Sequence, residues 1–235
     1  MKRLLLLIIL SSYLTSFAQK EKNDLLAEVL NKLEIDKADC FDQLITHHDF
    51  GKETLFIIPT VNEEGDGYAI LNSNIILINN QNHEIIGKFQ KNEDLYTDAV
   101  LLDKIEIDSN LFRISNSKSA FKVIFLYSNN SKPNPYSSVS ISLFIHEKKS
   151  LRRILKEYDI ETMTGETDSN CQGEFEKHKK QFQIIENSSQ PFPEIKVLDS
   201  IRNIRLSQNC KMEVVQTKLI TDTLRFQANE YKYAM

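Results

Sequence analysis

The sequence is poor in the residues from which common catalytic motifs are built. It has no tryptophan, six glycines, five prolines and three cysteines in 235 residues. So few glycines leave little material for a phosphate-binding loop, and no Gly-x-Ser-x-Gly turn is present for a serine nucleophile. The five histidines lack the His-Glu-x-x-His spacing that puts two metal ligands on one helix face. We therefore expect no metal, no cofactor and no catalytic residues, which disfavours an enzyme without excluding one.

The chain also lacks a block of charge of one sign. Its 29 basic and 33 acidic residues give a formal net charge of −4. Nucleic-acid binding needs a basic surface that displaces counterions from phosphates, and the sequence has no such stripe. We therefore exclude nucleic acid as a partner.

The first eighteen residues have the three parts of a secretory signal. Lys2 and Arg3 precede the apolar run Leu4–Leu10, and Ser16–Ala18 supplies small residues at the cleavage site. An uncleaved membrane anchor is the alternative, but the run is shorter than the ~20 residues that span a bilayer. No later segment is hydrophobic enough to cross a membrane. The sequence thus predicts cleavage of residues 1–18 and a periplasmic or secreted protein.

Export to an oxidising compartment predicts a disulfide among the three cysteines. We expect Cys171 to pair with Cys210, because both lie in the C-terminal half, although pairs through Cys40 remain open. Closing that loop of about forty residues is worth roughly 4 kcal/mol in the chain-entropy model. Three aspartates around Cys40 would raise the pKa of its thiol, which argues against a cysteine nucleophile. They are Asp36, Asp39 and Asp42.

Residues 23–34 have the pattern of one amphipathic helix. Asn23 can cap its start, and Glu28 and Lys32 form an i,i+4 pair on the polar face. The apolar face consists of Leu25, Leu26, Val29, Leu30 and Leu33. A stripe at this spacing usually docks on a core.

From residue 52 onward, short bursts rich in Ile, Val and Phe alternate with turn residues, which predicts strands. The expected strands are Thr54–Pro59, Tyr68–Leu71, Asn74–Ile78, Glu84–Phe89, Val100–Ile107, Leu111–Ser115, Phe121–Tyr127, Val139–His146, Leu151–Tyr158, Gly173–Lys177, Gln181–Ile185, Ile195–Leu198, Lys211–Leu219 and Leu224–Phe226. Ser150–Asp159 also fits a helix, but the repeat below favours a strand. Because no helical segments alternate with the strands, we expect antiparallel hairpins in a meander.

Two pairs of segments about seventy residues apart resemble each other. Ile76–Asn79 with 85–89 matches Leu143–His146 with 151–155, and Phe112–Val123 matches Phe182–Val197. Duplicated hairpins would favour a propeller-like or barrel arrangement. The alternative is coincidence, because short β patterns are degenerate.

Two acidic turns could suggest cation sites. Asp168–Gly173 begins like a calcium loop, but the twelfth position, which should hold a bidentate acid, is Lys179. Glu63–Gly67 has too few ligands. We interpret both as polar turns.

The loop Ser131–Ser138 is the best candidate for recognition. Two prolines stiffen it, and Asn134, Tyr136 and Ser137 could contact a partner at little entropic cost. The alternative is a rigid connection whose tyrosine packs back on the sheet.

The sequence predicts one β-rich domain over 19–235, with the helix at its start. Three functions remain open. The first is a non-enzymatic binding protein with a protein or glycan partner outside the cytoplasm, such as an inhibitor or immunity-type protein. The second is an envelope glycoside hydrolase that uses unrecognised carboxylates. The third is a structural or assembly component of the envelope.

Overall fold

The computed structural model describes residues 24–168, 172–185, 192–207 and 209–233. It divides into two compact units, Met1–Cys40 and Phe41–Met235. The predicted signal over 1–18 lies outside the described residues. The prediction of a single domain over 19–235 stays a prediction.

The first unit contains the amphipathic helix predicted from the leucine spacing. Residues 24–33 are helical, whereas the predicted cap, Asn23, lies outside the described residues. Val29 and Leu30, two of its predicted apolar positions, are buried. Leucine spacing alone therefore located this helix correctly.

Polar contacts stabilise the helix and the turn that follows it. The Glu28 carboxylate accepts from the Lys32 ammonium at 2.7 Å, as the i,i+4 spacing predicts. A short 3₁₀ turn, η1 (Lys37–Asp39), is capped by the Asp36 side chain, which accepts from the backbone N–H of Ala38 at 2.9 Å.

The second unit is almost entirely strand. After the 3₁₀ turn η2 (Asp42–Leu44), the elements are β1 (Thr46–Asp49), β2 (Glu53–Gly65), β3 (Tyr68–Asn79), β4 (Ile85–Thr97), β5 (Val100–Ile107), β6 (Phe112–Arg113), β7 (Ser119–Asn129), β8 (Tyr136–Glu147), β9 (Ser150–Thr167), β10 (Gly173–Ile185), β11 (Glu194–Leu206), β12 (Met212–Gln227) and β13 (Glu230–Tyr233). The predicted mainly-β, antiparallel meander is confirmed.

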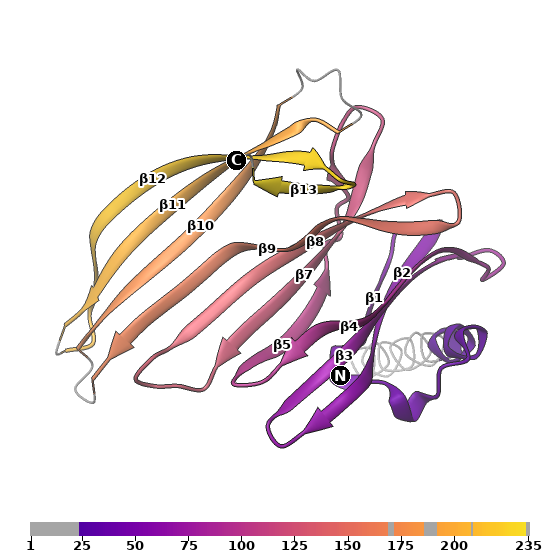
Figure 1. The fold of residues 1–235 in the computed structure, drawn as a ribbon, viewed down its shortest axis with the longest axis horizontal. Helices are drawn as coiled ribbons and strands as arrows, with labels where there is room; N and C mark the ends of the chain where they lie inside the picture. Colours follow the sequence, from indigo (N-terminus) through magenta and orange to yellow (C-terminus); the bar gives the residue numbers. More distant parts are fainter. Residues whose placement is uncertain (1–23, 169–171, 186–191, 208, 234–235) are drawn as a thin grey trace, which may run out of the picture. The chain divides into compact units, whose positions relative to one another are not determined.

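These strands form two sheets in sequence order (Figure 1). The small sheet has the order β1-β2-β3-β4, and the large sheet runs from β13 back to β7 and β5, with β6 paired to β7. Within the described residues, each sheet ends in two outer strands, and neither order closes on itself.

Tight turns with left-handed residues join neighbouring strands. Gly67 has φ +80° between β2 and β3, and Lys148 has φ +57° between β8 and β9. Ala228 and Asn229 are both left-handed between β12 and β13, which fits a two-residue hairpin turn. These turns explain why consecutive strands pair antiparallel.

Two apolar cores lie within this unit. The first joins both sheets and contains Leu44, Leu55, Ile57, Ala69, Leu71, Ile75, Leu77, Leu95, Leu102, Ile105, Phe121, Val123, Phe125, Phe144 and Leu151. The second lies along the large sheet and contains Ile114, Ala120, Ile141, Leu143, Ile145, Ile154, Leu155, Tyr158, Phe192, Ile195, Val197, Leu224 and Tyr231.

A buried ion pair joins the two sheets. Asp94 of β4 accepts two hydrogen bonds from the Arg153 guanidinium of β9, at 2.7 and 2.9 Å. The Asp94 side chain is only 1% exposed. Nearby, Nε2 of His146 in β8 lies 2.8 Å from the Ile86 carbonyl oxygen in β4. These contacts fix the small sheet against β8 and β9.

Candidate functional site

The outer end of the large sheet, made of β10, β11 and β12, differs from the rest of the unit in its exposure. The three strands lie side by side (Figure 1), and Phe175, Ile204 and Val214 stand opposite one another across them. Near β13 the strands are buried, for example at Val197 and Leu224. Toward the opposite end of these strands, which we call the tip, the side chains become exposed. This end of the sheet therefore has accessible surface.

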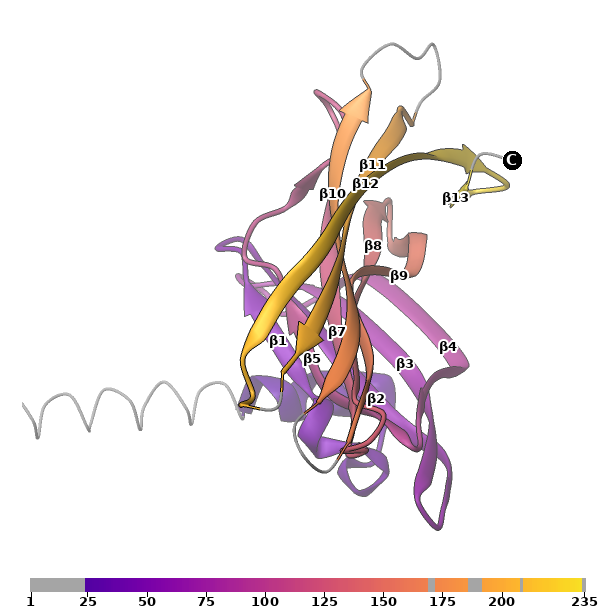
Figure 2. The same cartoon turned by 90° about the vertical axis from the view of Figure 1, so that its left-hand side faces the viewer.

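The strand β12 has an open edge. Its neighbour β13 pairs only with Leu224–Gln227, at the end of β12 that lies far from the tip (Figure 2). Residues 212–223 have β11 on one side and no strand on the other among the described residues. We call this stretch the free edge. Half of its backbone N–H and C=O groups therefore face away from the sheet.

Large apolar side chains project from the free edge. All ten residues from 212 to 221 are exposed. The apolar members are Met212, Val214, Val215, Leu219 and Ile220. Leu219 is the most exposed of them, at 77%. Single exposed apolar residues are ordinary, but five along one open strand are typical of an interaction surface.

A β-bulge interrupts the free edge near its start. Asn203 pairs with Gln216 and Ile204 pairs with Val214, so Val215 is an extra residue in β12. A bulge increases local twist and breaks the alternation of side chains between the two faces. The regular part of the free edge therefore runs from 216 to 223.

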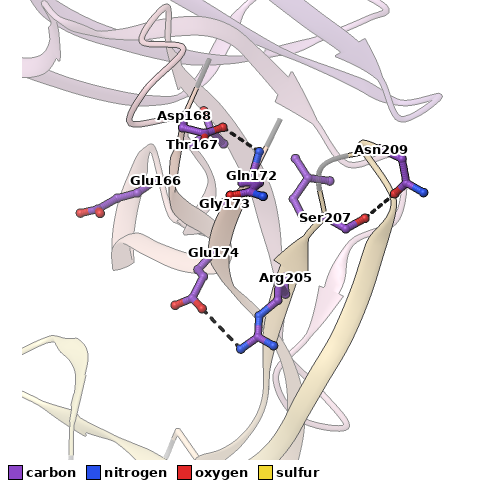
Figure 3. Close-up of a pocket in the computed structure, with 10 residues that line it drawn as sticks. Glu166, Thr167, Asp168, Gln172, Gly173, Glu174, Arg205, Ser207 and Asn209 are labelled. Carbon is purple, nitrogen blue, oxygen red and sulfur yellow. Dashed lines mark hydrogen bonds and ion pairs between the residues drawn. The ribbon is translucent and has the colours of Figure 1, made fainter. Parts of the chain in front are cut away.

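A polar pocket lies where the β9–β10 and β11–β12 turns meet (Figure 3). It has a volume of about 1030 Å³ and is open to solvent. We call it the tip pocket. Its lining residues are Glu166, Thr167, Asp168, Gln172, Gly173, Glu174, Arg205, Leu206, Ser207 and Asn209.

Hydrogen bonds within the two turns shape the tip pocket. The Asp168 carboxylate accepts from the Gln172 backbone N–H at 2.8 Å, and the Ser207 hydroxyl donates to the Asn209 side chain at 2.5 Å. Arg205 and Glu174 form an exposed ion pair at 3.6 Å across β10 and β11 (Figure 3). Such an exposed pair contributes little to stability. The described part of the chain contains no group of three or more His, Cys, Asp or Glu that could hold a metal ion.

A second, smaller hollow lies beside the tip pocket. Phe175, Ile204 and Val215 line it together with Asn134 from the loop before β8. The Phe175 ring lies over Gly165 of β9, because a Cβ placed there would lie 2.3 Å from the ring. Only glycine therefore allows this ring position, which brings Phe175 of β10 against β9.

The three residues predicted for recognition are placed in different ways. Asn134 lines the hollow just described, whereas Tyr136 and Ser137 are the first residues of β8 and are half-buried. The Asn129 side chain accepts from the Tyr136 backbone N–H at 2.9 Å and donates to the Asn134 carbonyl at 2.9 Å. These bonds hold the loop in one conformation. A binding role for the three residues stays a prediction.

The predicted disulfide also stays a prediction. Cys171, which is expected to pair with Cys210, lies outside the described residues. Cys40 is half-buried as a thiol, with Sγ 3.6 Å from the Asp36 carbonyl oxygen.

One histidine in β10 has an environment that the sequence did not indicate. His178 of β10 contacts Asp199 through Nδ1 at 2.8 Å and Glu176 through Nε2 at 3.1 Å. Partial burial lowers the pKa of His178, but the hydrogen bonds and charges of the two carboxylates outweigh it and raise the pKa. Glu176 could have been found from its i−2 spacing, whereas Asp199 is near only because of the β10–β11 register.

Buried carboxyl groups near the two-sheet junction were the other candidates for chemistry. The Tyr127 hydroxyl donates to Glu157 Oε2 at 3.1 Å, and Glu157 Oε1 is buried without a hydrogen-bond partner in the described residues. Burial raises the pKa of Glu157. Asp94 differs, because two hydrogen bonds from Arg153 already occupy its carboxylate. Their contacts are with side chains of neighbouring strands. We therefore assign these groups to the packing of the sheets and not to the pair of carboxylates that glycoside hydrolysis requires.

No α-helix in the described residues has the length and apolar character needed to cross a membrane. No known protein family, curated protein or solved structure matches the chain.

Proposed function

We propose that this protein is a non-catalytic binding protein that works outside the cytoplasm and takes up a protein partner by strand addition at the free edge. The observation that carries the proposal is the run of exposed residues along β12, with backbone groups facing outward and five large apolar side chains. The signal-like first eighteen residues support the location.

An open strand edge suits an extended polypeptide better than a sugar. In strand addition, outward N–H and C=O groups supply affinity, and alternate side chains supply specificity. The free edge offers both. A glycan site would need aromatic platforms, and none of the large apolar side chains exposed along residues 212–221 is aromatic. A protein partner is therefore the better fit.

Natural proteins protect most open edges against non-specific pairing, with charges or bulges. This edge has Lys218 and the bulge at Val215, yet the residues beyond them, Leu219 and Ile220, remain exposed. The protection is therefore partial, as suits an edge that must pair with a chosen partner.

The test is capture by the immobilised full chain from envelope and secreted fractions of its own source. Leu219→Lys places a charge on the free edge without touching the core, and Leu111→Lys is the matched control in an exposed loop. We expect a captured protein with the wild type and Leu111→Lys, and its loss with Leu219→Lys. Identical capture by all three chains, or no capture at all, would contradict the proposal.

We also propose that the two hairpin pairs about seventy residues apart arose by duplication. The segments Ile76–Asn79 with 85–89 and Leu143–His146 with 151–155 fall in the hairpins β3–β4 and β8–β9. The other pair falls in β6–β7 and β10–β11. Equivalent hairpins support the repeat, and a propeller-like or barrel relation between them stays part of this proposal.

A further inference from the structure

The free edge has limits that define how a partner strand can pair with it. At one end the bulge at Val215 breaks the alternation of side chains. At the other end Leu224 is already paired with Tyr233 of β13. The regular, unpaired stretch is therefore 216–223, and Leu219, one of the two residues at its middle, is also its most exposed apolar residue.

We infer that the partner of this stretch is a second copy of the same chain, paired antiparallel along 216–222 with the two Leu219 residues opposite each other. The inference rests on the proposed binding role of the free edge and names its partner. It follows from the symmetry of such a pair and from the order of side chains along β12.

Two-fold symmetry restricts the possible registers. In an isologous dimer, if residue i pairs with residue j of the second copy, then j pairs with i. Residues directly opposite in an antiparallel pair also share a face of the sheet. Because neighbouring residues point to opposite faces, one residue must therefore stand opposite its own copy. The register of the dimer is therefore defined by the residue that occupies this central position.

A centre at Leu219 pairs residues 216–222, all of which lie in the regular stretch. Lys218 then stands opposite Ile220, Thr217 opposite Thr221, and Gln216 opposite Asp222. No two like charges are opposed. Lys218 and Asp222 of the second copy become diagonal neighbours, which is within reach of a lysine side chain. The pairing supplies on the order of seven backbone hydrogen bonds and brings the exposed Leu219 side chains of the two copies together.

The neighbouring centres are less favourable. A centre at Lys218 sets two lysines against each other, which is destabilising. A centre at Thr217 would have to continue through the bulge, where Val214 and Ile220 project from opposite faces. A centre at Ile220 pairs 217–223 and sets Lys218 opposite Asp222, but it puts Ile220, which is 40% exposed, at the centre in place of Leu219, which is 77% exposed. The register centred on Ile220 is thus the competing arrangement.

Cysteine cross-linking can read the register directly. A cysteine at the central residue faces its own copy at a Cα separation of about 4.5–5.5 Å, which permits a disulfide. A cysteine two positions away is separated from its copy by about 13 Å along the strand, which does not. The substitutions are Leu219→Cys, Thr217→Cys as the matched control, and Ile220→Cys for the competing register. Each is made in the full chain with Cys40→Ser.

We expect the wild type to show a concentration-dependent monomer–dimer equilibrium in analytical ultracentrifugation, and Leu219→Lys to remain monomeric. Under mild oxidation, Leu219→Cys should form a covalent dimer on a non-reducing gel, and Thr217→Cys should not. Trapping by Ile220→Cys instead would overturn the register. A dimer that Leu219→Lys leaves intact would overturn the interface.

The outcome separates this inference from the proposed function. If the wild type stays monomeric while Leu219→Lys loses a different captured protein, the free edge binds a partner other than its own copy, and the inference fails alone. If the wild type stays monomeric and capture is the same for every variant, both fail.

Discussion

The two ends of the large sheet use the same antiparallel pairing, yet they are covered to very different extents. At β7–β9, side chains such as Phe125 and Phe144 pack into the core shared with the small sheet, and Arg153 is bonded to the buried Asp94. At β10–β12, residues 212–221 are all exposed. Strand pairing therefore fixes the backbone at both ends, whereas only the junction gains stability from burial. The end of the sheet made of β10–β12, which we call the free end, therefore keeps exposed surface.

The largest expected difference between the two ends concerns ion pairs. Arg153→Met leaves the Asp94 carboxylate buried without its bidentate partner, so we expect a loss of about 3–5 kcal/mol in unfolding free energy. The control Arg225→Met removes the exposed Arg225–Glu194 contact of 2.8 Å, which should cost under about 1 kcal/mol. Urea unfolding followed by circular dichroism measures both. Equal losses would mean that the junction pair is no more important than a surface pair.

The same leucine-to-alanine change should lower the unfolding free energy by different amounts at the two ends of the large sheet. Leu143 is fully buried, so Leu143→Ala should cost about 2–5 kcal/mol. Leu219→Ala removes an exposed side chain and should change the unfolding free energy of the monomer by less than about 0.5 kcal/mol. Dilute protein keeps self-association out of the measurement. A large loss for Leu219→Ala would show that the free end is covered in the folded monomer.

A pH series should show a smaller effect at the junction. Burial raises the pKa of Glu157, although Lys156 and Tyr127 oppose it, so the folded protein favours the neutral acid. The resulting stability is present below the unfolded value of 4.5 and falls as pH rises through the folded pKa. Glu157→Gln should remove this decline when unfolding free energies are compared from pH 4 upward. A decline that persists in Glu157→Gln would assign it to another group.

The smallest expected effect belongs to His178 at the free end. Asp199 and Glu176 raise its pKa despite partial burial, so the charged ring adds stability that is fully present below the unfolded value of 6.5. This stability is lost as pH rises through the folded pKa. His178→Gln should flatten the change above pH 6.5. Titration of the ring by nuclear magnetic resonance gives an independent check, because a pKa at or below 6.5 would contradict the two contacts.

Local sequence pattern was enough to find most strands. The segment Ser150–Asp159 was ambiguous between helix and strand, and the structure places it in β9, as the repeat favoured. Lys211–Leu219 and Leu224–Phe226 were predicted as two strands but form the single strand β12, because Ile220 to Thr223 continue the pairing with β11. β1 was missed, because Thr46–Asp49 has no apolar residue to signal a strand.

The candidate site was harder to predict than the strands. Met212, Val214 and Leu219 have the pattern of a half-buried strand, and such residues usually face a core. Their exposure follows from strand order, since β12 is almost the last strand of the large sheet and β13 is short. The Asp94–Arg153 pair likewise joins residues 59 positions apart. Local sequence spacing reveals neither property. Of the predicted recognition loop, only Asn134 lines the candidate site.

The short strand β13 has a consequence for how the protein could change its partner. By occupying Leu224–Gln227, it sets the length of edge that remains unpaired, and with it the midpoint of any symmetric pairing. Lengthening β13 so that it pairs with two more residues of β12 would move that midpoint by one position and change which residues stand opposite each other at the contact. A change in a strand that touches no partner would thus alter the register of recognition, while every side chain of β12 keeps its face of the sheet.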